Sequence, residues 1–123
     1  MEIKFTLPYP KPMRQFCKLY GLNAIYSGKH WSKRRQDSEY WHLLVKNELR
    51  KNKIPKKEFK KPVMIRFSWN DGLDCSNHAY AGKMIEDALK GWVIHDDSKK
   101  YVREIRHRFH DENYIMVEVM EDF

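Results

Sequence analysis

The feature that most constrains the fold is a strand-like segment that leads directly into a helix-like one. Apolar residues occupy every second position from Val63 to Trp69, which is the pattern of a β-strand with one buried face. A turn signal follows at residues 70–72, and apolar residues then recur at helical spacing as far as about Lys90, before Gly91. We therefore expect a strand and a helix that packs against it.

The remaining periodic segments extend this unit into a single domain, residues 1–123. Ile3, Phe5 and Leu7 alternate with polar residues, as do the apolar positions of 101–109 and 114–120. The last two segments are separated by a connection short enough for a hairpin. A helical stripe from about Asp37 to Lys51 contains Trp41, Leu44, Val45 and Leu49. The order strand–helix–strand–helix–strand–strand predicts an α+β fold, a mostly antiparallel four-stranded sheet packed with two helices on one face.

The charge balance points to a polyanionic partner. Lys and Arg number 24 against 17 Asp and Glu, giving a net charge of +7, and this excess favours nucleic acid. The longest apolar runs fall far short of the roughly 20 residues of a membrane span, and no secretory leader is evident, so we expect a cytoplasmic protein without a membrane partner. Cys17 and Cys75 are expected to be reduced thiols.

Residues 12–35 lack sustained periodicity and are predicted to form a long loop. Aromatic side chains alternate with cations there, which is typical of nucleic-acid contacts, although the aromatics could equally pin the loop to the core. The candidate nucleic-acid-binding residues are Tyr26, Lys29, Trp31, Lys33, Arg34 and Arg35. A second basic run, residues 51–61, is interpreted as a solvated connection, with phosphate contact as the alternative.

The stretch from Leu73 to Val102 places acidic residues at both ends of the predicted helix. Asp74 precedes the helix, while Asp96 and Asp97 follow it. A divalent metal would relieve the repulsion between such carboxylates. That hypothesis requires residues 92–95 to reverse the chain and return Asp97 to Asp74. The alternative is that Asp74 merely caps the helix, and Lys83 could likewise pair only with Asp87.

The motif in this stretch resembles the RusA-type Holliday junction resolvases. The family pattern runs D-x-D-N, K, D-A-L, D-D, and the matching residues here are Asp74, Asn77, Lys83, Asp87-Ala88-Leu89 and Asp96-Asp97. The resemblance is loose over most of the chain and specific over about thirty residues. It departs from the family at Ser76, which stands where the second aspartate is expected, and in the longer spacing from Asn77 to Lys83.

The resemblance implies a homodimeric, magnesium-dependent endodeoxyribonuclease, expected to be of phage type, that resolves four-way DNA junctions by paired symmetric nicks in recombination and repair. Manganese could replace magnesium. Asp74, Lys83 and Asp97 would be catalytic, and the metal would be held by Asp74, Asp96, Asp97 and Asn77. Asp71, Glu86 or Asp87 are further candidates for the ligand missing at Ser76.

Two other functions fit the same residues. Loss of the second carboxylate could leave a structure-selective DNA-binding protein of the same fold that does not cleave. A small basic RNA-associated structural protein would also account for the charge, with the acidic residues acting only as caps.

Overall fold

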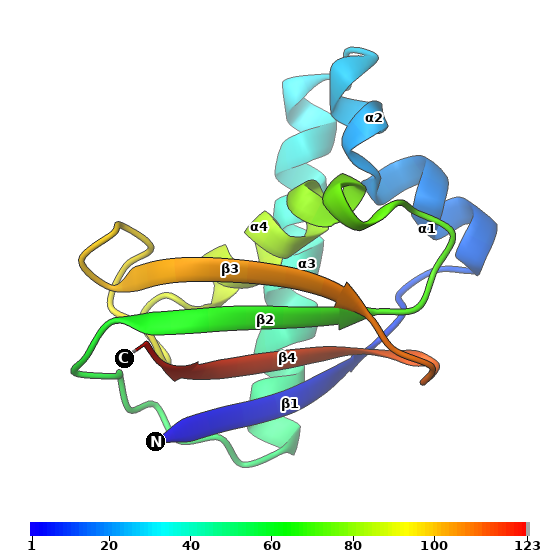
Figure 1. Ribbon diagram of the computed structural model, residues 1–123. Coiled ribbons are helices and arrows are strands. Elements are labelled where there is room, and N and C mark those ends of the chain that lie inside the picture. Colours follow the sequence, from blue (N-terminus) through cyan, green and yellow to red (C-terminus); the bar gives the residue numbers. More distant parts are fainter. Residues whose placement is uncertain (123) are drawn as a thin grey trace.

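The computed structural model describes residues 1–122 and contains one four-stranded sheet with helices packed against it (Figure 1). The elements in chain order are β1 (Glu2–Pro8), α1 (Met13–Tyr20), α2 (Leu22–Tyr26), α3 (Trp31–Lys51), β2 (Val63–Trp69), η1 (Cys75–His78), α4 (Ala79–Leu89), β3 (Val102–Phe109) and β4 (Tyr114–Glu121). The predicted α+β class is confirmed.

The sheet is mixed, with the strand order β1-β4-β2-β3. β4 pairs antiparallel with both β1 and β2, whereas β2 pairs with β3 in parallel. The predicted hairpin between the last two strands is therefore wrong, because β2 lies between them. The connection from β3 to β4 instead crosses the end of β2, where the His110 amide donates to the Trp69 carbonyl at 3.0 Å. A short connection was compatible with a hairpin but did not require one.

The buried face of the sheet is formed by the alternating apolar residues. Ile65, Phe67 and Trp69 of β2 are at most 1% exposed, and Trp41, Val45 and Leu49 of α3 are buried in the same hydrophobic core. Figure 1 shows α3 passing behind the sheet, with α4 nearer the β3 side. The period-two and helical patterns thus predicted the two layers that form this core.

The predicted loop over residues 12–35 is wrong, because this segment forms α1, α2 and the first turn of α3. Phe16 and Tyr20, one helical turn apart, are buried on α1, and their rings lie 6.2 and 5.3 Å from that of Trp41. Helices this short are marginal on their own and depend on tertiary packing. The spacing of four residues between Phe16 and Tyr20 was the available signal for a helix, but Gly21 and Gly28 obscured it.

The basic connection between α3 and β2 is largely exposed, as predicted. Its exception is Phe59, which is 5% exposed and whose amide donates to the Val93 carbonyl at 2.8 Å. One apolar side chain therefore anchors an otherwise solvated run of lysines.

Candidate functional site

Two lysines and two aspartates form a charged cluster between α4 and the loop that follows it. The Lys83 ammonium contacts Asp97 Oδ2 and lies 3.1 Å from Asp87 Oδ1. Lys90 Nζ lies 3.1 Å from Asp87 Oδ1 and 3.2 Å from Asp97 Oδ2. Each lysine therefore bridges both carboxylates. We refer to Lys83, Asp87, Lys90 and Asp97 as the lysine–aspartate cluster.

The chain reaches this arrangement through a tight reversal at the end of α4. Gly91 adopts φ +77°, a left-handed conformation that glycine adopts readily. Its amide donates to the Ile94 carbonyl at 2.8 Å, and an isolated bridge joins Lys90 to Ile94. The expected reversal over residues 92–95 thus takes place as a turn. It brings Asp97 to Lys83 and Lys90, and not to Asp74 as expected.

Lys83, Lys90 and Asp97 keep their charges, because the pKa values of the two lysines are raised and that of Asp97 is lowered. Hydrogen bonds from Lys83 hold the pKa of Asp97 well below its usual range, and Lys90 adds to this effect. Burial lowers the pKa of Lys83, but its hydrogen bonds to Asp97 and Asp87 outweigh burial and raise that pKa. The Lys83 side chain is nevertheless 54% exposed. A fixed and accessible ammonium of this kind can contact an anionic oxygen of a ligand.

Glu86 lies at the edge of the cluster, 3.7 Å from Lys83 Nζ. It is 8% exposed, and burial raises the pKa of its carboxyl. The neighbouring carboxylates of Asp97 and Asp87 also raise it, because a further negative charge there would be repelled.

Asp74 lies away from this cluster. It is exposed at the N-cap of η1, where its carbonyl accepts from the Asn77 amide at 3.0 Å but its side chain makes no capping hydrogen bond. It follows the carboxyl end of β2, whereas Asp96 and Asp97 precede β3, and these two strands pair in parallel register. The two acidic sites therefore flank opposite ends of a strand of 7 residues (Figure 1), roughly 20 Å at about 3.3 Å per residue.

The predicted metal ligands do not fit one shared ion in this arrangement. Within residues 1–122, no group of three or more His, Cys, Asp or Glu side chains is placed to hold a metal. The carboxylates nearest Asp97 are bridged by lysines, and Asp74 with Asn77 belongs to the other end of the helix. The assignment of Asp74, Asp96, Asp97 and Asn77 as ligands stays a prediction.

A second set of ionisable side chains, which the sequence did not predict to lie together, is buried near Asp74. Asp71 accepts from the Tyr9 hydroxyl at 2.8 Å, from the Leu73 amide at 2.9 Å and from His78 Nε2 at 2.7 Å. The His78 and Asp71 side chains are both 0% exposed. His78 Nδ1 faces the Cys75 carbonyl at 2.9 Å, so both ring nitrogens face oxygen acceptors. This buried Asp71–His78 network holds the turn on either side of Asp74.

The histidine ring also packs among aromatic groups. His78 stacks on Trp69, with ring centroids 4.4 Å apart. The Trp69 indole donates to His107 Nδ1 at 3.1 Å, and burial lowers the pKa of His107. Alternation predicted that Trp69 and residue 107 lie on strands, but no local pattern indicated that β2 and β3 pair and bring them together.

The predicted nucleic-acid contacts divide into exposed and buried residues. Tyr26 and Trp31 are 77% and 61% exposed, so they do not pin this segment to the core. Lys33, Arg34 and Arg35 are also exposed on the first turns of α3, with Arg35 3.4 Å from Glu39. We call Tyr26, Trp31, Lys33, Arg34 and Arg35 the basic–aromatic tip. In Figure 1, α2 and the start of α3 project above the sheet.

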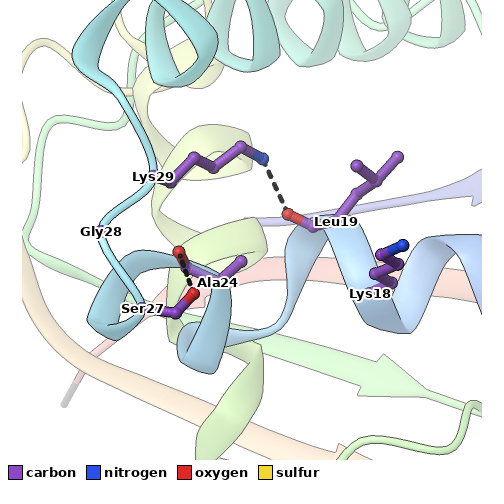
Figure 2. Close-up of a pocket in the computed structure, with 6 residues that line it drawn as sticks. All are labelled: Lys18, Leu19, Ala24, Ser27, Gly28 and Lys29. Atoms are coloured by element: carbon purple, nitrogen blue, oxygen red, sulfur yellow. Dashed lines mark hydrogen bonds between the residues drawn. The ribbon is translucent and has the colours of Figure 1, made fainter.

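Lys29 has a different environment from the tip. Its ammonium donates to the Leu19 carbonyl at 2.9 Å and pairs with Asp37, and its side chain is only 12% exposed. Figure 2 shows Lys29 reaching the Leu19 carbonyl, and Lys18, Leu19 and Lys29 are among the residues that line a hollow of about 330 Å³. Asp37 also accepts from the Tyr80 hydroxyl at 2.7 Å, so Lys29 ties α1, α3 and α4 together. This geometry favours a structural role for Lys29.

Cys17 and Cys75 are not joined by a disulfide, and their reduced state stays a prediction. None of the helices in residues 1–122 combines the length and apolar character needed to cross a bilayer. No family model matches this chain, and no curated protein matches it.

Proposed function

We propose that this protein is a RusA-type endodeoxyribonuclease that cleaves four-way or related branched DNA. The observation that carries the proposal is the contact between Lys83 and Asp97, which are 14 residues apart along the chain. They are also the residues that match the family's essential lysine and its late acidic pair. In this proposal Lys83 neutralises the scissile phosphate or the leaving oxygen in the transition state.

The carboxylates give Lys83 a defined position for this role. Asp97 and Asp87 hold its ammonium by ion pairs and keep it protonated. Because the side chain stays half exposed, a phosphate oxygen can approach it from solvent. Lys83 is thus prepositioned for an anionic substrate, which lowers the entropic cost of binding it productively.

The basic–aromatic tip is the proposed surface for the DNA arms. Its cations would contact backbone phosphates, and its exposed rings offer faces on which bases can stack. Paired symmetric nicks require two identical sites, so we propose a homodimer with two-fold symmetry. Magnesium, or manganese, is the proposed cofactor by family resemblance. Because the predicted ligands do not gather around one ion, no catalytic step is assigned to it.

A cleavage assay tests the proposal. A labelled four-way junction and a linear duplex of the same sequence are incubated with the protein in magnesium or in EDTA. We expect symmetric nicks in the junction only, in magnesium only, and strongly reduced for Asp97→Asn. The exposed Asp111 supplies the control Asp111→Asn, which should cleave normally. Undiminished cleavage by Asp97→Asn would sink the assignment of this cluster.

A second candidate is a structure-selective DNA-binding protein that does not cleave. It is favoured by the distance of Asp74 from the lysine–aspartate cluster and by Ser76 at the position of the family's second aspartate. This function predicts tight, salt-sensitive junction binding without nicks at any magnesium or manganese concentration. Metal-dependent nicks that EDTA abolishes would exclude it. A preference for duplex RNA over junction DNA in competition would instead support the RNA-associated alternative.

A further inference from the structure

We propose that Lys99, Lys100 and Arg103 form an anion site that binds a phosphate group of the nucleic-acid backbone. These residues line a hollow of about 360 Å³ at the start of β3. It lies beside the lysine–aspartate cluster but uses none of its residues. The identity of the phosphate as part of DNA rests on the proposed function, whereas the preference for an anion rests on the three side chains themselves.

The backbone holds these side chains in place. The amides of Tyr101 and Val102 both donate to the Ser98 carbonyl at 2.9 Å, which closes a turn whose central residues are Lys99 and Lys100. Arg103 occupies an irregularity in the sheet, because Val63 pairs with Val102 while Met64 pairs with Glu104. Arg103 is thus the extra residue of a bulge, a device that redirects a side chain at a strand end. The turn and the bulge together place three cationic residues along one hollow, where the Lys100 ammonium also lies 5.5 Å from the Tyr101 ring centroid.

These cations have no acidic partner within residues 1–122. Neither ion pairs nor side-chain hydrogen bonds of Lys99, Lys100 or Arg103 occur in this part of the chain, and the nearby Glu104 pairs with Arg106 at 2.6 Å. Three like charges that line one hollow repel one another, because physiological salt screens charge only over roughly 8–10 Å. A phosphate would offset this repulsion, and the planar arginine fork suits its oxygens.

The hollow follows Asp97, one of the candidate catalytic residues, in the same loop. Asp97 is two residues before Lys99, so their Cα atoms are at most about 7.6 Å apart, at 3.8 Å per residue. A strand whose phosphate sits in the hollow would therefore pass close to Lys83. This geometry assigns the hollow a positioning role: it would hold a phosphate next to the one that is cleaved, without contacting the reacting atoms.

The test compares two triple variants with equal changes in charge. Lys99→Gln/Lys100→Gln/Arg103→Gln removes the hollow's cations, and Lys57→Gln/Lys60→Gln/Lys61→Gln removes three exposed lysines from the connection before β2. Junction affinity is measured in EDTA over a salt series, so that cleavage plays no part. For each phosphate that a variant no longer neutralises, the slope of log K against log salt should become shallower by about 0.9. We expect the slope to become shallower by about 0.9 or more in the hollow variant, and by clearly less in the control variant.

A titration with inorganic pyrophosphate, followed by NMR of the backbone amides of residues 98–103, separates the sources of the phosphate. We expect saturable shifts in the wild type and the control variant that are absent in the hollow variant. Shifts without any difference in junction slope would assign the hollow to a free phosphate and overturn the nucleic-acid assignment. Equal slopes in both variants and no pyrophosphate shifts would overturn the site altogether. If the wild type bound no junction, the proposed function would fail while the titration still tested the hollow.

Discussion

The buried Asp71–His78 network and the exposed lysine–aspartate cluster use carboxylates for different purposes. Both join carboxylates to basic groups at the two ends of one helical segment. In the buried network the side chains are 0% exposed and Asp71 accepts from three groups, which leaves no room for a ligand. In the cluster the Lys83 side chain is 54% exposed. The Asp71–His78 network is buried and its hydrogen-bonding groups are all occupied, which indicates a structural role. The lysine–aspartate cluster is the one of the two that a ligand can reach.

The largest expected effect of a substitution is therefore on the buried side. Asp71→Ala leaves His78 and Tyr9 without their shared acceptor inside the core. Each buried donor left unsatisfied costs about 1–3 kcal/mol, so we expect a total loss of about 3–5 kcal/mol. Urea unfolding at pH 7 should show a loss in this range, while the control Asp111→Asn, at an exposed site, should be nearly neutral. A loss below about 1 kcal/mol for Asp71→Ala would mean that the network does not stabilise the fold.

The basic–aromatic tip should respond in binding rather than in stability. Replacing Tyr26 and Trp31 by alanine removes two exposed rings, and base stacking contributes about 1–3 kcal/mol per base. We expect junction affinity to fall tenfold or more, measured by fluorescence anisotropy, with the unfolding free energy changed by less than about 0.5 kcal/mol. The exposed Leu43 of α3 supplies the control Leu43→Ala. Unchanged affinity in the double variant would remove the tip from the DNA interface.

The buried side should also be sensitive to mild acid. The pKa of His107 is lowered by burial and by the neighbouring His78, so below pH 6.5 the unfolded chain binds a proton that the folded chain resists. Stability should therefore decrease as the pH falls from 7.5 to 5.0. His107→Gln, which retains an acceptor for the Trp69 indole, should reduce this decrease, whereas the exposed control His95→Gln should not. Equal pH dependence in the wild type and His107→Gln would contradict the burial effect.

The sequence predicted those parts of the molecule that depend on local periodicity. Alternation at Ile65, Phe67 and Trp69 indicated β2, and helical spacing around Trp41 and Val45 indicated α3. It did not predict that β2 would separate β3 from β4, because strand order depends on contacts between distant residues. The helix α1 was missed for a related reason: its buried rings, Phe16 and Tyr20, pack on Trp41, which lies outside the segment.

In the candidate site, too, local features were predicted from the sequence, whereas contacts between distant residues were not. The motif indicated Lys83 and Asp97, and the turn at Gly91 does bring them together. Grouping Asp74 with Asp97 required the chain to return over the whole length of the helix, which local sequence does not determine. Lys29 resembled a phosphate contact among the cations of residues 29–35, yet Asp37 and the Leu19 carbonyl bind its ammonium.

The central claim is that the exposed cluster acts on DNA without being needed for the fold. Single-turnover cleavage of a four-way junction by Lys83→Met tests it most directly, with Lys51→Met at an exposed position of α3 as the control. We expect the cleavage rate to fall about 100-fold or more, as when a single transition-state donor is removed. The unfolding free energy should change by no more than about 1 kcal/mol, because Lys83 is exposed. Cleavage by Lys83→Met at the wild-type rate would contradict the account.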